Sequence, residues 1–259
     1  MTELNRKDLK GPDQFESKVK PMFNDMRKHA KTWIAAAVVI LAVGLAYGIY
    51  DSQKKAFENE GSEALFIASK SLDKKFVELA KKSLGKEEPS KKPDLNGMPD
   101  PDLDEIAFVR IDVQSSLSSE IEALKKVSEK YHGSRAGFEA DLKLGDLFFD
   151  HALQGSDEAL KWYQSALDQA NSTLDKSFAA YAQAHALEAH GKFEEAIKTL
   201  ETVMHEAPES FEPELMMTLA RVEQKSGNTA RASELYDEIQ IKHQNTDFAR
   251  RASALKKRL

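Results

Sequence analysis

Hydrophobic residues form one uninterrupted run near the N-terminus and are spaced three or four positions apart along most of the remaining chain. The run, WIAAAVVILAVGLAYGIY at residues 33–50, contains eighteen residues and no charge. As a helix it would be roughly 27 Å long, close to the hydrocarbon thickness of a bilayer. This pattern predicts a single transmembrane helix over residues 33–50.

The spacing after residue 50 is typical of amphipathic helices. Apolar residues recur every three or four positions from Phe57 to Leu79, which predicts a stalk helix within residues 51–84. Residues 85–103 contain four of the eight prolines and predict a linker. A loop of this length is compatible with either a disordered segment or a functional one. A second stripe predicts one long helix from Ile106 to Tyr131. With few glycines and prolines overall, the chain is expected to be all-α, with a helical domain over residues 104–259.

The residues that flank the apolar run predict its orientation. Trp33, Tyr47 and Tyr50 lie at its ends, where amphipathic rings prefer the headgroup region. Residues 17–32 carry five Lys or Arg, against two in residues 51–65. The positive-inside rule therefore places the basic arm, residues 1–32, in the cytoplasm and the body outside.

Two other interpretations of the apolar run are a cleaved signal and a buried core helix. Ala46 and Gly48 could precede a cleavage site. However, thirty-two residues precede the run and the run itself is eighteen residues long, and both lengths exceed those of a normal signal. A buried helix of a soluble protein would normally keep one polar face. Gly44 and Gly48 have the GxxxG spacing that lets two membrane helices pack closely, although lipid also tolerates such small residues. Self-association is therefore left open.

The C-terminal half repeats with a period of about thirty-six residues. Ala184 recurs as Ala220, and four further pairs keep the same separation: Gly191 and Gly227, Ala196 and Ala232, Leu200 and Tyr236, and Val203 and Ile239. Ala159, Tyr163 and Ala166 stand one unit earlier. Small residues let two antiparallel helices approach, larger ones fill the gap between pairs, and the glycines permit tight turns. A fixed period of this length is typical of a helical solenoid.

This stretch resembles a tetratricopeptide repeat protein. LGDLFF at residues 144–149 is similar to the LGxxY element of that repeat, and HGKFEEAIKTLETVMHEAP at residues 190–208 matches its turn, second helix and terminal proline. The resemblance covers residues 131–244, with FARRASALKKRL as a capping helix. Gln183 and Glu223 stand where the repeat pattern has apolar residues.

The order of arm, membrane helix, stalk and repeats resembles the bacterial ancillary subunits of the Sec translocon. That resemblance implies a single-pass inner-membrane protein with a periplasmic domain and, as protein partners, a translocon subunit, an envelope chaperone or a client chain. The longer arm and the Pro-rich linker depart from that family. The C-terminal repeats also resemble the Tol-Pal-associated coordinator family, which implies an envelope organiser linked to division.

The repeat resemblance also implies a binding face. In such repeats the first helix of each pair lines the concave surface. The residues that do so are those that do not face its partner helix. Carried over to this chain, these positions are Leu142, Asp146, Phe149, Asp150, Tyr181, His185, Glu188, Met217, Arg221 and Gln224. Their mixture of aromatic, Met and charged side chains suits a peptide segment. Ordinary half-exposed helix positions would look the same.

Composition and motifs argue against other classes of function. The chain has no cysteine, and residues 51–259 carry twenty-nine basic against thirty-eight acidic residues, which disfavours nucleic acid as a partner. His185, Glu188 and His190 lack metal-binding spacing, because His190 points about 140° away from His185 on a helix. Asp146 and Asp150 are one turn apart, as on many solvated faces. We therefore expect no metal, no cofactor and no enzymatic activity.

Overall fold

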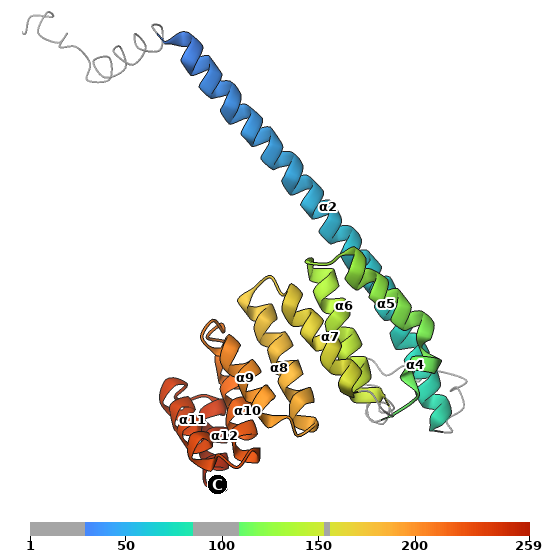
Figure 1. The fold of residues 1–259 in the computed structure, drawn as a ribbon, viewed down its shortest axis with the longest axis vertical. Coiled ribbons are helices and arrows are strands. Elements are labelled where there is room, and N and C mark those ends of the chain that lie inside the picture. The colour runs from blue at the N-terminus through green and yellow to red at the C-terminus, as the bar shows by residue number, and fades with distance from the viewer. Residues whose placement is uncertain (1–28, 85–108, 153–155) are drawn as a thin grey trace, which may run out of the picture. The chain divides into compact units, whose positions relative to one another are not determined.

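The computed structural model describes residues 29–84, 109–152 and 156–259, and almost all of these residues are helical (Figure 1). The all-α fold class is confirmed, since no named strand occurs in these ranges. The chain divides into two compact units, Met1–Ala56 and Phe57–Leu259. The first part of the basic arm, residues 1–28, and the Pro-rich linker at residues 85–103 lie outside the described residues.

In the first unit the structure describes the beginning of helix α2, which spans Ala30–Ser83. Its residues 33–50 are uncharged and exposed, and by length and composition α2 is a candidate membrane span. No proline interrupts residues 30–83, so the helix continues through residue 50 without a break. The predicted membrane helix and stalk are therefore one continuous helix.

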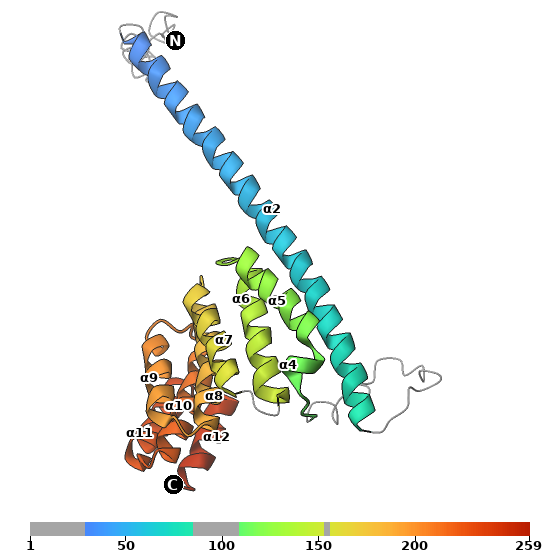
Figure 2. The same cartoon turned by 45° about the vertical axis from the view of Figure 1, so that its right-hand side comes forward.

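The second unit contains the remainder of α2 and a series of short helices. These are α4 (Val113–Ser116), α5 (Ser118–Lys130), α6 (Arg135–Asp146), the π-helical turn η1 (Leu147–His151), α7 (Ser156–Gln169), α8 (Thr173–Ala189), α9 (Phe193–Met204), α10 (Glu212–Lys225), α11 (Thr229–Lys242) and α12 (Asp247–Lys256). From α5 onward each α-helix contacts the next one in the chain, in the order that both views show (Figures 1 and 2). Three helix pairs result, α6 with α7, α8 with α9 and α10 with α11, and α12 closes the series.

Local signals in the sequence explain most helix ends. The side chains of Ser134, Ser172, Asn228 and Thr246 accept hydrogen bonds from backbone N–H groups in the first turns of α6, α8, α11 and α12. Gly191 and Gly227 turn the chain inside the second and third pairs with φ of 72° and 96°, a region that residues with a Cβ rarely adopt.

The expected long helix from Ile106 to Tyr131 differs from the structure in two respects. Ile106 itself lies outside the described residues, but residues 109–112 are described and are not helical, and α4 begins at Val113, where the side chain of Asp112 accepts from the N–H of Ser115. The helix is also interrupted at Leu117, between α4 and α5. Serines on both sides of Leu117 are poor helix formers because their hydroxyls compete for backbone groups, and the buried Leu117 side chain is held by the core instead.

The C-terminal part of α2 belongs to the core of the second unit. Leu72, Phe76 and Ala80 are buried in one apolar cluster with residues of α5, α6 and α7. Gly61 approaches the ring of Tyr131 so closely that a Cβ at this position would crowd it. Residues 57–83 therefore cover the flank that α5 and α6 would otherwise expose.

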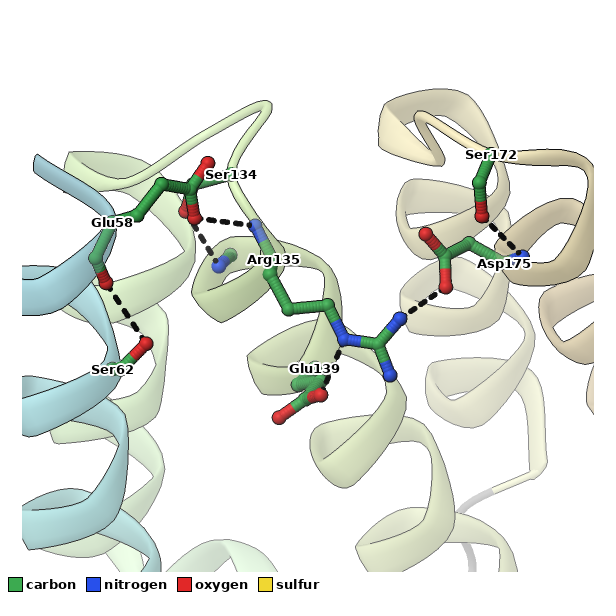
Figure 3. A network of polar contacts seen from close by, with 8 residues as sticks. Glu58, Ser62, Ser134, Arg135, Glu139, Ser172 and Asp175 are labelled. Carbon is green, nitrogen blue, oxygen red and sulfur yellow. Dashed lines mark hydrogen bonds and ion pairs between the residues drawn. The ribbon is translucent and has the colours of Figure 1, made fainter. Parts of the chain in front are cut away.

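A polar network also fixes this part of α2 to the helix pairs (Figure 3). The carboxylate of Glu58 accepts a hydrogen bond of 3.2 Å from the backbone N–H of Arg135, at the N-terminus of α6. The guanidinium of Arg135 in turn contacts Glu139 on its own helix and Asp175 on α8. Carboxylates at helix N-termini are favoured by the unpaired backbone N–H groups there. Glu58 of α2 lies at the N-terminus of α6, and Asp175 lies in the first turn of α8, so Arg135 connects α6 to both helices.

Close packing inside the first pair depends on Gly145. A Cβ at this position would overlap the ring of Tyr163, which is buried against α6 from the facing helix α7. Only glycine permits this contact. The small residue at position 145 therefore has a defined partner on the facing helix.

Gly145→Ala is expected to lower the free energy of unfolding by a net of about 1–2 kcal/mol, because overlap with Tyr163 outweighs the gain in helix propensity. Denaturant unfolding of the detergent-solubilised chain, followed by circular dichroism, measures the change. Glu129→Ala, at an exposed position of α5, is the control and should stay within about 0.5 kcal/mol of wild type. Equal stability of Gly145→Ala and wild type would contradict the close contact.

Candidate functional site

Repeat-equivalent residues meet on the face built from the first helices of the second and third pairs, α8 and α10. His185 and Arg221, which stand 36 positions apart, are in contact, with the Arg221 Nη2 atom 3.1 Å from His185 Nε2. A guanidinium can only donate, so Nε2 of His185 accepts and the imidazole is neutral. The ring of Tyr181, one turn earlier on α8, lies 4.4 Å from the imidazole between centroids.

Glu188 fixes the cationic side of this contact. Its side chain is only 4% exposed, with Oε2 at 3.0 Å from Arg221 and Oε1 at 2.8 Å from Lys225. Arg221 and Lys225 are one turn apart on α10, so one carboxylate of α8 holds two cations of α10. Glu188 was predicted as a partner-binding residue, and the structure places it beneath the surface as a support for Arg221.

A pocket of about 220 Å³ opens beside this cluster. Its walls come from α8, α10 and α12, and its lining residues are Tyr181, His185, Glu214, Met217, Thr218, Arg221, Arg251 and Leu255. The structure thus brings together four of the residues predicted from the sequence: Tyr181, His185, Met217 and Arg221. Met217 is buried, with 5% of its surface exposed, and forms part of the floor.

Aromatic side chains, of which Phe178 is exposed and Tyr181 and Phe211 are half-buried, extend the site toward the N-terminal ends of α8 and α10. The Phe178 ring is 4.6 Å from that of Phe211, which in turn is 5.8 Å from Tyr181. Leu174 and Phe178, one turn apart, remain 39% and 41% exposed. We call Phe178, Tyr181 and Phe211, together with the neighbouring Leu174, the aromatic row. Large apolar side chains that stay exposed next to a pocket are typical of a binding surface.

Two ionisable groups of the site have shifted pKa values. The pKa of His185 lies below its ordinary value of 6.5, because burial and then the charge of Arg221 disfavour the imidazolium, against the opposing charges of Glu188 and Glu214. The pKa of Tyr181 is raised by burial and by Glu214, whose carboxylate accepts from the Tyr181 hydroxyl at 3.4 Å. The site therefore presents a neutral imidazole and a protonated phenol beside two arginines.

The candidates of the first repeat unit do not line this pocket. Leu142 and Phe149 are half-buried beside the core, and Asp150 is exposed. Asp146 accepts a hydrogen bond of 2.8 Å from the hydroxyl of Tyr163, on its own partner helix. The pKa of Asp146 is raised because its carboxyl group is shielded from solvent, although the residue as a whole is exposed. Burial also raises the pKa of Tyr163.

The other predicted positions also lie apart from the pocket. Gln224 is half-buried on α10 and is not one of the lining residues. Gly44 and Gly48 belong to the apolar part of α2, where a Cβ would meet no atom within 4 Å. Their proposed role in helix packing stays a prediction.

Several residues of the site were not predicted from the sequence. Phe178 precedes Tyr181 by one turn, so helical spacing could have identified it. Phe211 lies in the connection before α10, and Arg251 and Leu255 lie on the closing helix α12. No repeat spacing connects these three residues to α8, so only the fold places them there.

The described residues contain no group of three or more His, Asp or Glu side chains arranged to hold a metal ion. The pocket instead combines an apolar and aromatic side with hydrogen-bond donors from arginine and threonine and with the carboxylate of Glu214. Such a surface can hold a protein segment by apolar contact and orient it by polar contacts.

The fold defines the class as a helical repeat protein built from stacked antiparallel pairs. A sequence profile of the tetratricopeptide repeat family matches residues 187–259, which contain α9 to α12. The C-terminal region is therefore similar to tetratricopeptide repeats, which supports the resemblance seen in the sequence. Comparison with curated proteins gives no significant match.

The His185 shift predicts a pH dependence of stability. Because the folded-state pKa is lowered, the neutral imidazole stabilises the fold above about pH 6.5, and this contribution is lost as the pH falls toward the folded-state pKa. The difference in unfolding free energy between wild type and His185→Gln should therefore shrink on acidification from about pH 7.5 to about pH 5.

NMR titration of the His185 ring protons gives an independent measurement. In Arg221→Gln the His185 pKa should rise, because a nearby positive charge is removed. Lys257→Gln, at an exposed position beyond α12, is the control and should leave the titration unchanged. A His185 pKa at or above 6.5 in wild type would contradict the proposed contact with Arg221.

Proposed function

We propose that the protein is a membrane-anchored interaction module that binds a protein segment on the face of α8, α10 and α12. The observation that carries this proposal is the aromatic row, of which Leu174 and Phe178 stay 39% and 41% exposed beside a pocket that contains Arg221 and Arg251. Tetratricopeptide repeats are protein-interaction modules, and the matched region includes α10 and α12 of the site. The segment would place apolar side chains on Phe178 and Tyr181 and acceptor groups near Arg221 and Arg251.

The membrane anchor is the apolar part of α2. We propose that residues 33–50 span the bacterial inner membrane with the N-terminus in the cytoplasm and the repeats in the periplasm. The charge difference across the run and the aromatic residues at its ends support this orientation. Tethering would confine the repeats to a thin layer at the membrane, so that weak contacts there gain from a high effective concentration.

The proposed partners are a translocon subunit, an envelope chaperone or an emerging client chain, so that the module assists the biogenesis of secreted or membrane proteins. This proposal rests on the resemblance in element order described above. An envelope organiser of the Tol-Pal coordinator type would use the same binding face but would be enriched at the division septum. A uniform membrane distribution supports the translocon proposal.

The orientation can be tested by cysteine labelling, because the chain contains no native cysteine. Ile241→Cys, at an exposed position of α11, should react with a membrane-impermeant maleimide in intact spheroplasts. Thr2→Cys, in the basic arm, should react only after the membrane is permeabilised. The reverse pattern, or a mature chain that begins near residue 49, would disprove the proposed topology.

The binding face can be tested with a photoreactive amino acid incorporated at Leu174. We expect a discrete crosslinked product in membranes, and the same probe at Ile241 should give none, since Ile241 is exposed but lies outside the aromatic row. Adding Phe178→Ala to the Leu174 probe should weaken capture about tenfold, as truncation of an aromatic anchor often does. Mass spectrometry of the product distinguishes translocon, chaperone and client from division proteins.

Equal crosslinking from both positions, or capture that is insensitive to Phe178→Ala, would contradict the proposed face. Phe178→Ala is expected to leave the fold intact because the side chain is 41% exposed, and circular dichroism checks this.

A further inference from the structure

A second hollow lies on the other side of α10, between α9 and α11. Its volume is about 610 Å³. On α10, this groove is lined by Glu212, Met216 and Leu219, whereas the pocket described above is lined by Met217 and Arg221. With 3.6 residues per turn, these two sets lie on opposite sides of the helix. The groove is therefore a separate surface.

The base of the groove is apolar and adaptable. Met204 and Ala207 are half-exposed, and they lie over Met216, Leu219 and Leu235, which are buried. Methionine is unbranched and polarizable, so it can fit apolar side chains of different shape. The groove can thus seat one or two apolar side chains of a bound segment.

The rim of the groove is acidic. It carries the four carboxylates of Glu201, Glu209, Glu212 and Glu238. Lys242 is shared between Glu212 at 3.3 Å and Glu238 at 2.7 Å, and Arg231, the other cation of the rim, is engaged by Glu234 outside it. Within the described part of the chain, Glu201 and Glu209 have no ion pair. The rim therefore has an excess of negative charge and two carboxylates ready to pair.

We propose that this acidic groove binds a basic amphipathic segment of a partner protein. Apolar side chains of the segment would lie on Met204, and its Lys or Arg side chains would reach Glu201 and Glu209. Helix-in-groove recognition needs this combination of an apolar floor and a rim of opposite charge. The site is independent of the aromatic row, so one repeat region could hold two partners or two segments of one partner.

Charge argues against the other occupants. A bilayer with anionic lipids would be repelled by the rim carboxylates. A second copy that used the same surface would oppose like charges across a two-fold axis. A basic segment is the occupant whose charge complements the groove.

The proposal can be tested with the full chain in neutral-lipid nanodiscs. Since the chain has no cysteine, Ser210→Cys labelled with an environment-sensitive dye places a single reporter next to Glu209 of the groove. The probe is a peptide of about four helical turns with Leu and Met on one face and Lys and Arg on the other. We expect a saturable signal that weakens as salt is raised.

Two variants and a matched control locate the site. Glu201→Lys with Glu209→Lys should weaken binding about tenfold or more, as expected for two lost ion pairs and new repulsion. Glu122→Lys with Glu129→Lys, at exposed positions of α5, changes the net charge equally and should stay within about twofold of wild type. Met204→Ser should also weaken binding, because it removes the exposed apolar contact.

Several results would overturn the proposal. These are an equal loss in both charge-reversal pairs, equally tight binding of a peptide with Glu in place of Lys and Arg, insensitivity to Met204→Ser, and the absence of a saturable signal at millimolar peptide. Self-association that requires Glu201 and Glu209 would identify a second copy as the occupant instead. Phe178→Ala should not change the peptide affinity, so a failure of the aromatic row and a failure of this groove give different results.

Discussion

Stacking of helix pairs against their neighbours is the constraint on which the second unit depends. Each pair buries one apolar flank inside itself and needs the next pair to cover the other, so the stability of such a series is a sum of nearest-neighbour contacts. The contact between Gly145 and Tyr163 shows how this works at one position, where a residue without a side chain faces a large ring. At the N-terminal end residues 57–83 of α2 supply the cover, and at the C-terminal end α12 does so.

The same stacking explains why a polar cluster forms between α8 and α10. Neighbouring first helices repeat at a fixed offset, so residues 36 positions apart come to lie one above the other. His185 and Arg221 are such a pair, and Glu188 holds Arg221 from the helix turn that follows. The neutral state of His185 follows from this arrangement, because a guanidinium next to a partly buried imidazole disfavours a second positive charge. The polar cluster of His185, Glu188 and Arg221 is thus a consequence of the repeat.

Much of the helical order could be predicted because it depends on local spacing. The 36-residue period located the helix pairs, and the glycines at 191 and 227 marked their turns. Four predicted residues meet at the pocket, since they follow that period. Phe211 and Arg251 could not be predicted, because contact with α8 requires the paths of the preceding connection and the closing helix. The split at Leu117 was missed because apolar spacing alone continued across it.

The two departures from the repeat pattern have different structural reasons. Gln183, at a buried position of α8, donates a hydrogen bond of 2.8 Å to Gln164 of α7, so an amide pair replaces apolar packing between these helices. Glu223 is also buried and accepts from the side chain of Asn228, which caps α11. Both polar groups are paired, which removes most of the cost of burial. Gln183 thus joins α8 to α7, whereas Glu223 stabilises the turn between α10 and α11.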